Sequence, residues 1–124
     1  MIPYDHGFRP PAPVVDVEVA HPLRTRVVIQ LRGKLDTGAD TTVIPSRLVQ
    51  QLGLASRSSA WLRSYDGTYS RRPLYYVRLQ IIGLVLFAVR CASADRETML
   101  LGRNVLNRFV IRLDGKRLLF DIKQ

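Results

Sequence analysis

The clearest candidate for chemistry in this sequence is a carboxylate in a tight turn, Asp36-Thr37-Gly38. Apolar, strand-forming residues precede the turn, and Gly38 allows the backbone to bend sharply and to be approached closely. A carboxylate in this position lies at the end of a strand, where it can point out of the sheet and act as a general acid or base. The three residues alone are a weak signal, because an Asp-Thr-Gly turn also occurs without any chemistry.

Two further features follow this turn along the chain. Tyr65-Asp66-Gly67-Thr68 lies between strand-forming residues, and an Asp-Gly pair in that setting predicts a β-hairpin. Leu100-Leu101-Gly102-Arg103 places an arginine directly after an apolar run, which favours a partnered guanidinium over a surface charge. The serines show no His/Asp pattern of a serine hydrolase.

The elements that must position these residues are mostly strands. Residues 14–19 alternate apolar and acidic side chains, as a half-exposed strand does. Residues 26–31 form the second strand of a hairpin, and residues 32–34 interrupt it briefly. Further strands are expected over residues 42–44, 60–65, 68–70, 74–79, 81–89, 99–101, 110–113 and 118–122. Many short strands joined by hairpin turns predict an all-β, closed or nearly closed barrel.

Two short helices complete this prediction. Residues 47–52 place Leu48, Val49 and Leu52 on one helical face, with Ser46 as the N-cap and Gly53 closing the helix. Residues 103–109 form the second helix candidate.

The segment Leu35-Asp36-Thr37-Gly38-Ala39-Asp40-Thr41-Thr42-Val43-Ile44 resembles the active-site segment of the retropepsins, the retroviral-type aspartic proteases. Leu100-Leu101-Gly102-Arg103-Asn104-Val105-Leu106 resembles the second signature of that family, and the hairpin at 65–68 lies where the family has its flap. These features cover roughly residues 14–113 in the family's order. The pattern is closer to bacterial aspartyl-protease-like proteins than to a viral polyprotein product.

The resemblance implies a retropepsin-like closed β-barrel with one or two short helices that assembles as a C2 homodimer. The proline-rich composition of residues 1–13 predicts an extended N-terminal arm and not a folded element, and residues 14–124 would be the protease domain. Asp36 would be the catalytic carboxylate, Thr37 would bond across the dimer, and Gly38 would leave room and an amide for the substrate. One chain supplies one such aspartate, so two copies are needed to form a carboxylate pair that shares one proton.

The remaining roles implied by the resemblance concern substrate binding. Backbone groups of Ala39 and Asp40 would bond an extended peptide, and the Asp40 carboxylate would pair with Arg103 as structural support. The flap residues that would close over the peptide are Tyr65, Asp66, Gly67 and Thr68. The function implied is that of an aspartic-type endopeptidase, a hydrolase that needs no metal or other cofactor.

The length and composition of the chain restrict its domain count, its compartment and its partners. The 124 residues suffice for one domain, with 47% hydrophobic and 23% charged residues in a globular balance. No apolar run reaches the ~18 residues that span a bilayer, so no membrane partner is expected. The N-terminus has no signal-peptide pattern, and the expected compartment is therefore the cytoplasm. The single cysteine, Cys91, excludes an internal disulfide and is expected to be buried.

The net charge of +9 raises the question of nucleic-acid binding. The basic residues are spread over the whole chain, and no aromatic-basic RNA-binding motif is present, so nucleic acid is not the expected partner. Two alternatives to a peptidase stay open at this stage. One is a non-catalytic peptide-binding or dimerisation module on the same fold, and the other is a basic nucleic-acid-binding barrel whose binding would not depend on Asp36.

Overall fold

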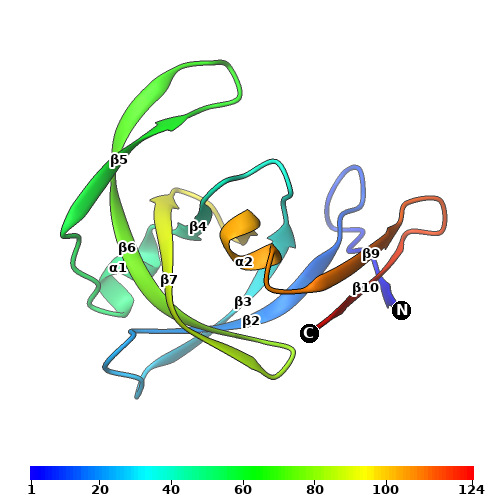
Figure 1. Cartoon of the computed structure of the whole chain (residues 1–124), viewed down its shortest axis with the longest axis horizontal. Helices are drawn as coiled ribbons and strands as arrows, with labels where there is room; N and C mark the ends of the chain where they lie inside the picture. The colour runs from blue at the N-terminus through cyan, green and yellow to red at the C-terminus, as the bar shows by residue number, and fades with distance from the viewer.

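The computed structural model describes all residues 1–124 and consists of ten strands and two short helices (Figure 1). Six strands form a closed barrel in the order β2-β3-β8-β4-β7-β6, which β2 and β6 close by pairing with each other. These strands are β2 (Val14–Ala20), β3 (Val28–Leu35), β4 (Thr42–Pro45), β6 (Tyr69–Ile81), β7 (Leu84–Ala94) and β8 (Met99–Leu101). The predicted retropepsin-like β-barrel with two short helices is therefore confirmed.

The other elements lie around this barrel. The strand β5 (Ser58–Arg63) pairs only with the first half of β6, and the two form a hairpin that arches away from the barrel (Figure 1). A separate three-stranded sheet has the order β1-β10-β9. The strands of that sheet and the helices are β1 (Ile2–Pro3), β9 (Val110–Asp114), β10 (Leu119–Lys123), α1 (Arg47–Gln51) and α2 (Arg103–Leu106).

The strand β3 runs unbroken to Leu35, so the predicted interruption at residues 32–34 is wrong. Arg32 and Lys34 point away from the core, whereas Gly33 points into it, where a Cβ atom would lie 2.8 Å from the Cγ2 atom of Val17. The side chains of neighbouring strands fill the space at Gly33. The polar residues 32–34, with their glycine, are thus part of the strand that leads into Asp36.

The strand β6 joins two segments that the sequence analysis treated as separate strands. It passes through Pro73, which pairs with Ser59 of β5, whereas the pairing of β6 with β7 begins only at Tyr75. At Pro73 the strand therefore lies at the edge of the sheet, where a missing N–H is tolerated. One continuous strand thus connects the arching hairpin to the barrel.

The helices differ from the prediction in detail. Ser46 makes no side-chain capping bond, while Gly53 has a φ of +64°, as a glycine that ends a helix requires. The helix α2 ends at Leu106 and not at residue 109, because the amides of Arg108 and Phe109 bond three residues back. No helix is long and apolar enough to cross a membrane.

The proline-rich N-terminal residues are docked on the protein, although the sequence analysis predicted an extended arm that is not a folded element. Ile2 pairs with Phe120 of β10, and the Tyr4 ring contacts the Phe120 ring at a centroid distance of 6.0 Å. Phe120 itself is fully buried in the main core. The two ends of the chain therefore form one sheet on the right of Figure 1.

Candidate active site

Asp36 directly follows the last residue of β3 and begins the loop to β4. Its backbone N–H donates to the carbonyl oxygen of Leu101 at 3.0 Å, which fixes the loop to β8. Its carboxylate atom Oδ1 accepts a hydrogen bond from the N–H of Gly38 at 3.0 Å, and Oδ2 has no protein partner. The half-buried carboxylate is thus oriented by its own turn, with one oxygen available to another group.

Arg103, the first residue of α2, ties this loop to the helix through three interactions. Its backbone N–H donates to the carbonyl oxygen of Ala39 at 2.8 Å, and its Nη1 atom donates to the carbonyl oxygen of Thr37 at 2.8 Å. Its Nη2 atom forms an ion pair with Oδ1 of Asp40. A planar guanidinium suits this arrangement because its two amino groups reach two different acceptors.

Gly102 allows the helix to approach the loop closely. A Cβ atom at this position would lie 2.8 Å from the carbonyl carbon of Thr41 and 3.0 Å from the carbonyl oxygen of Ala39. Both neighbours are backbone atoms, so any side chain at Gly102 would displace the loop.

Two residues missed in the sequence analysis, Thr42 and Asn104, connect the same elements from inside. The Oγ1 atom of fully buried Thr42 donates to Oδ1 of Asn104 at 2.8 Å and accepts from the N–H of Gly102 at 3.1 Å. The Nδ2 atom of Asn104 donates to the carbonyl oxygen of Arg90 in β7 at 2.8 Å. The only sequence signal for this network was that Thr42 and Asn104 each stand next to apolar residues within the two motifs.

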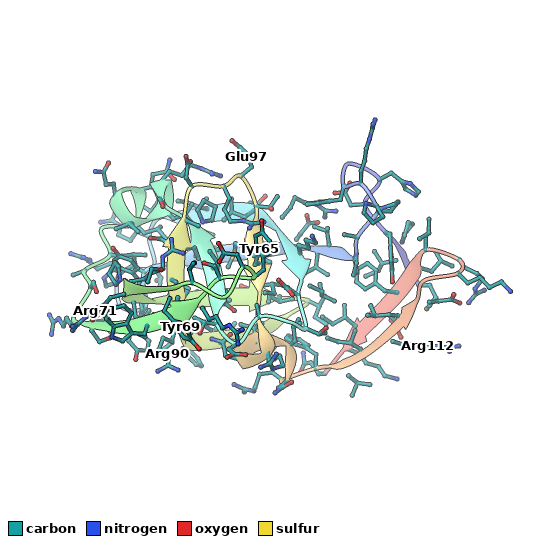
Figure 2. All side chains as sticks on the ribbon, turned by 90° about the horizontal axis from the view of Figure 1, so that it is seen from above. Tyr65, Tyr69, Arg71, Arg90, Glu97 and Arg112 are labelled. Atoms are coloured by element: carbon teal, nitrogen blue, oxygen red, sulfur yellow. The ribbon has the colours of Figure 1, made fainter.

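The β5–β6 hairpin arches on the same side of the barrel as the β3–β4 loop (Figure 1), and Tyr65 lies at its tip in the view from above (Figure 2). Gly67 has a φ of +87°, which the predicted Asp-Gly turn accounts for. Oδ1 of Asp66 accepts bonds from Oγ1 and N–H of Thr68 at 2.7 and 3.0 Å, and these bonds lower the pKa of Asp66. Trp61 is 65% exposed on this hairpin, so it is not a core residue.

The single chain does not surround Asp36 with a deep pocket. A hollow of about 460 Å³ lies on the outside of the barrel and is lined by residues such as Asp16, Glu18 and Arg32. Another, of about 450 Å³, lies beside α2 and is lined by residues such as Tyr76 and Phe87. No group of three His, Cys, Asp or Glu side chains is placed to hold a metal ion. Asp36 therefore lies in an open loop of the monomer.

The sequence matches the family described as "gag-polyprotein putative aspartyl protease" over residues 30–108, which is more than half of the chain. The chain belongs to the retropepsin-like aspartic proteases. No curated protein sequence matches it significantly.

Solved structures of this class share the fold. A retropepsin-like aspartic protease from Rickettsia conorii is 19% identical with a TM-score of 0.63, over 92% of this chain and 83% of that chain. The EIAV protease, in complex with the inhibitor HBY-793, is 23% identical with a TM-score of 0.57, over 78% and 86% of the two chains. A foamy viral protease-reverse transcriptase is 17% identical with a TM-score of 0.61, over 80% of this chain. This chain spans only 12% of that larger protein.

Proposed function

We propose that this protein is an aspartic endopeptidase that is active as a homodimer. The observation that carries the proposal is the Asp36 loop, which α2 and β8 hold in place while one carboxylate oxygen stays free. The nearest acidic residue in sequence, Asp40, is bound by Arg103 and is not available as a second catalytic group. A second Asp36 must then come from a second copy of the chain.

In the proposed dimer, the two Asp36 carboxylates lie close together and share one proton, because two adjacent carboxylates do not both ionise. The ionised carboxylate takes a proton from a water molecule, whose oxygen attacks the carbonyl carbon of the scissile peptide bond. The protonated carboxylate donates its proton to the carbonyl oxygen. The C–N bond then breaks as the amine nitrogen takes up a proton, and no metal takes part.

The exposed edge of β9 supports a dimer at the terminal sheet. In the order β1-β10-β9, only one side of β9 has a partner, so its other edge is free to pair with a second chain. Val110 and Leu113 of β9 are 58% and 49% exposed and stand on opposite faces of the strand. Pairing of two β9 edges would satisfy the free backbone groups of this edge, and the helix α2 would then lie next to the interface.

The β5–β6 hairpin would act as the flap. A peptide bound as an added strand beneath it would take hydrogen bonds from backbone groups of Ala39 and Asp40 in the loop. The turn residues that would cover the peptide are Tyr65, Asp66, Gly67 and Thr68. Closure of this hairpin would exclude bulk water from the reaction.

The test is cleavage of a mixed peptide library by the wild type and by Asp36→Asn, between pH 4 and pH 8. We expect the substitution to lower the rate by at least about 100-fold, because it removes the general acid and base of the reaction. Asp95→Asn is the matched control, since the exposed Asp95 side chain has no hydrogen-bond or ion-pair partner, lies outside the terminal sheet, and the charge change is the same. The wild-type rate should rise faster than linearly with the concentration of dilute protein. A folded, dimeric wild type that cleaves no peptide would instead indicate a binding module.

A further inference from the structure

A basic hollow lies toward the base of the β5–β6 hairpin, and no residue of the Asp36 loop lines it. It has a volume of about 560 Å³, and no acidic or large apolar side chain lines it. We call it the arginine pocket, and its polar lining consists of Arg57, Arg71, Arg72, Ser56, Ser58 and Ser59. Three arginines and three serines thus line one open hollow, with no acidic side chain among them.

Two of these guanidinium groups are already held in place by the protein. The Nε atom of Arg71 donates to Oγ of Ser59 at 2.7 Å, and Nη2 of Arg72 donates to the carbonyl oxygen of Ser93 at 2.5 Å. Neither residue forms an ion pair, and Arg57 forms none either. Because each guanidinium has five N–H donors, most of them are still available, and the fixed orientation reduces the entropy lost when an anion binds.

We propose that the arginine pocket binds an oxyanion, a carboxylate or a phosphate, carried by an acidic segment of the peptide substrate. The inference rests on the proposed peptidase function. It predicts a preference for substrates that carry acidic side chains at some distance along the peptide from the scissile bond. Arginine forks bind carboxylates and phosphates through paired, charge-assisted hydrogen bonds, and serine hydroxyls add further donors.

The position of the pocket indicates which part of the substrate would reach it. Arg71 pairs with Trp61 about halfway along the paired part of the hairpin, four residues from Gly67, and Figure 2 shows it well away from Tyr65. At about 3.3 Å per residue, this separation corresponds to roughly 13 Å, the length of about four residues of an extended peptide. The acidic residue is therefore expected about four or more residues from the bond that is cut.

The lining of the pocket favours a peptide over nucleic acid. Proteins that bind single-stranded nucleic acid combine positive charge with aromatic rings on which the bases stack. No aromatic side chain lines the arginine pocket. We therefore do not expect the pocket to prefer an oligonucleotide, and the experiment includes one as a test.

The experiment measures binding in the Asp36→Asn background, so that cleavage does not interfere. Three fluorescein-labelled peptides share an apolar centre and carry, at one end, two glutamates, two glutamines or one phosphoserine. Fluorescence anisotropy gives their dissociation constants for the parent and for Arg57→Gln/Arg71→Gln. The control is Arg26→Gln/Lys116→Gln, which changes two exposed basic residues elsewhere and lowers the net charge of +9 by the same amount.

We expect the glutamate and phosphoserine peptides to bind more tightly than the glutamine peptide. The pocket variant should weaken their binding about tenfold or more, whereas the control should change it less than about twofold. Equal effects of the two variants would overturn the proposal, because they would reflect net charge alone. An oligothymidylate that binds more tightly than the acidic peptides, and that loses affinity only in the pocket variant, would also overturn it.

These results are separable from the peptidase test. Cleavage by the wild type without any preference for the glutamate peptide would leave the peptidase function intact and refute the role of the arginine pocket. Selective binding of the glutamate peptide by a protein that cleaves nothing would support the pocket and refute the peptidase function.

Discussion

Gly102→Ala is the substitution that most directly tests how the active-site loop is held. The added Cβ would lie 2.8 Å from the carbonyl carbon of Thr41, whereas ordinary contact begins at 3.4 Å, so the two must separate by about 0.6 Å. The obstacle is backbone and not a flexible side chain, so a rotamer change does not relieve it. Overpacking of this kind costs about 1–3 kcal/mol of unfolding free energy.

The same displacement should lower activity more than it lowers stability. A misplacement of about 1 Å can cost roughly 100-fold in rate, and each of the two loops in the proposed dimer would be displaced. We therefore expect the cleavage rate to fall at least about tenfold. Urea unfolding at one fixed protein concentration gives the stability, and cleavage of a peptide identified from the library gives the activity.

Gly115→Ala is the matched control, because a Cβ atom at Gly115 meets nothing within 4 Å and the φ of this residue is not positive. It should change neither the unfolding free energy nor the cleavage rate appreciably. If Gly102→Ala behaves like Gly115→Ala in both assays, close contact between α2 and the Asp36 loop does not hold the site. Loss of stability without loss of activity would show that the contact supports the fold alone.

Three further predictions concern the same region and the core. Arg103→Met should lower the unfolding free energy by about 1–2 kcal/mol through two lost hydrogen bonds, while Arg108→Met should change it by less than about 0.5 kcal/mol in the same urea assay. Thr42→Val should cost about 1–3 kcal/mol, because it leaves the buried N–H of Gly102 without an acceptor, and Thr42→Ser should restore most of that loss. Burial raises the pKa of the Cys91 thiol from 9.0 to about 12, so the folded protein should not react with a disulfide reagent at pH 8, whereas the unfolded chain should. Because the pKa of Cys91 is higher in the folded protein than in the unfolded chain, the stability that the neutral buried thiol contributes is complete below pH 9. That stability is lost as the pH rises toward 12.

The strands were predictable wherever the pattern of side chains reflects one buried face. In β2, the alternation of valines with Asp16 and Glu18 predicted the strand, and the structure places the valines inside. The Asp66-Gly67 turn was predictable for a local reason, since a positive φ at Gly67 determines the hairpin. The Asp36 loop was found through its motif, although the polar residues 32–34 before it obscured the continuation of β3 to Leu35.

What the sequence could not indicate depends on contacts between distant segments. Gly33 appeared to interrupt a strand, because the side chains of Val17 and Leu101 that fill the space beside it come from other strands. The hydrogen bond between Thr42 and Asn104 joins residues that are 62 positions apart. The proline-rich N-terminus pairs with β10 at the other end of the chain, so local composition alone predicted a free arm.

The helix α2 connects the two surfaces on which the proposed function depends. Its first residue, Arg103, holds the Asp36 loop, and β9 begins at Val110, four residues after α2 ends. The amides of Asn107, Arg108 and Phe109 all bond back to this helix, so the segment between it and β9 is not a free linker. Pairing of β9 with a second chain would therefore also restrain α2 and the loop that it holds. Dimerisation would then supply the second Asp36 and fix the geometry of the first, which predicts that substitutions in β9 and in α2 reduce activity through a common cause.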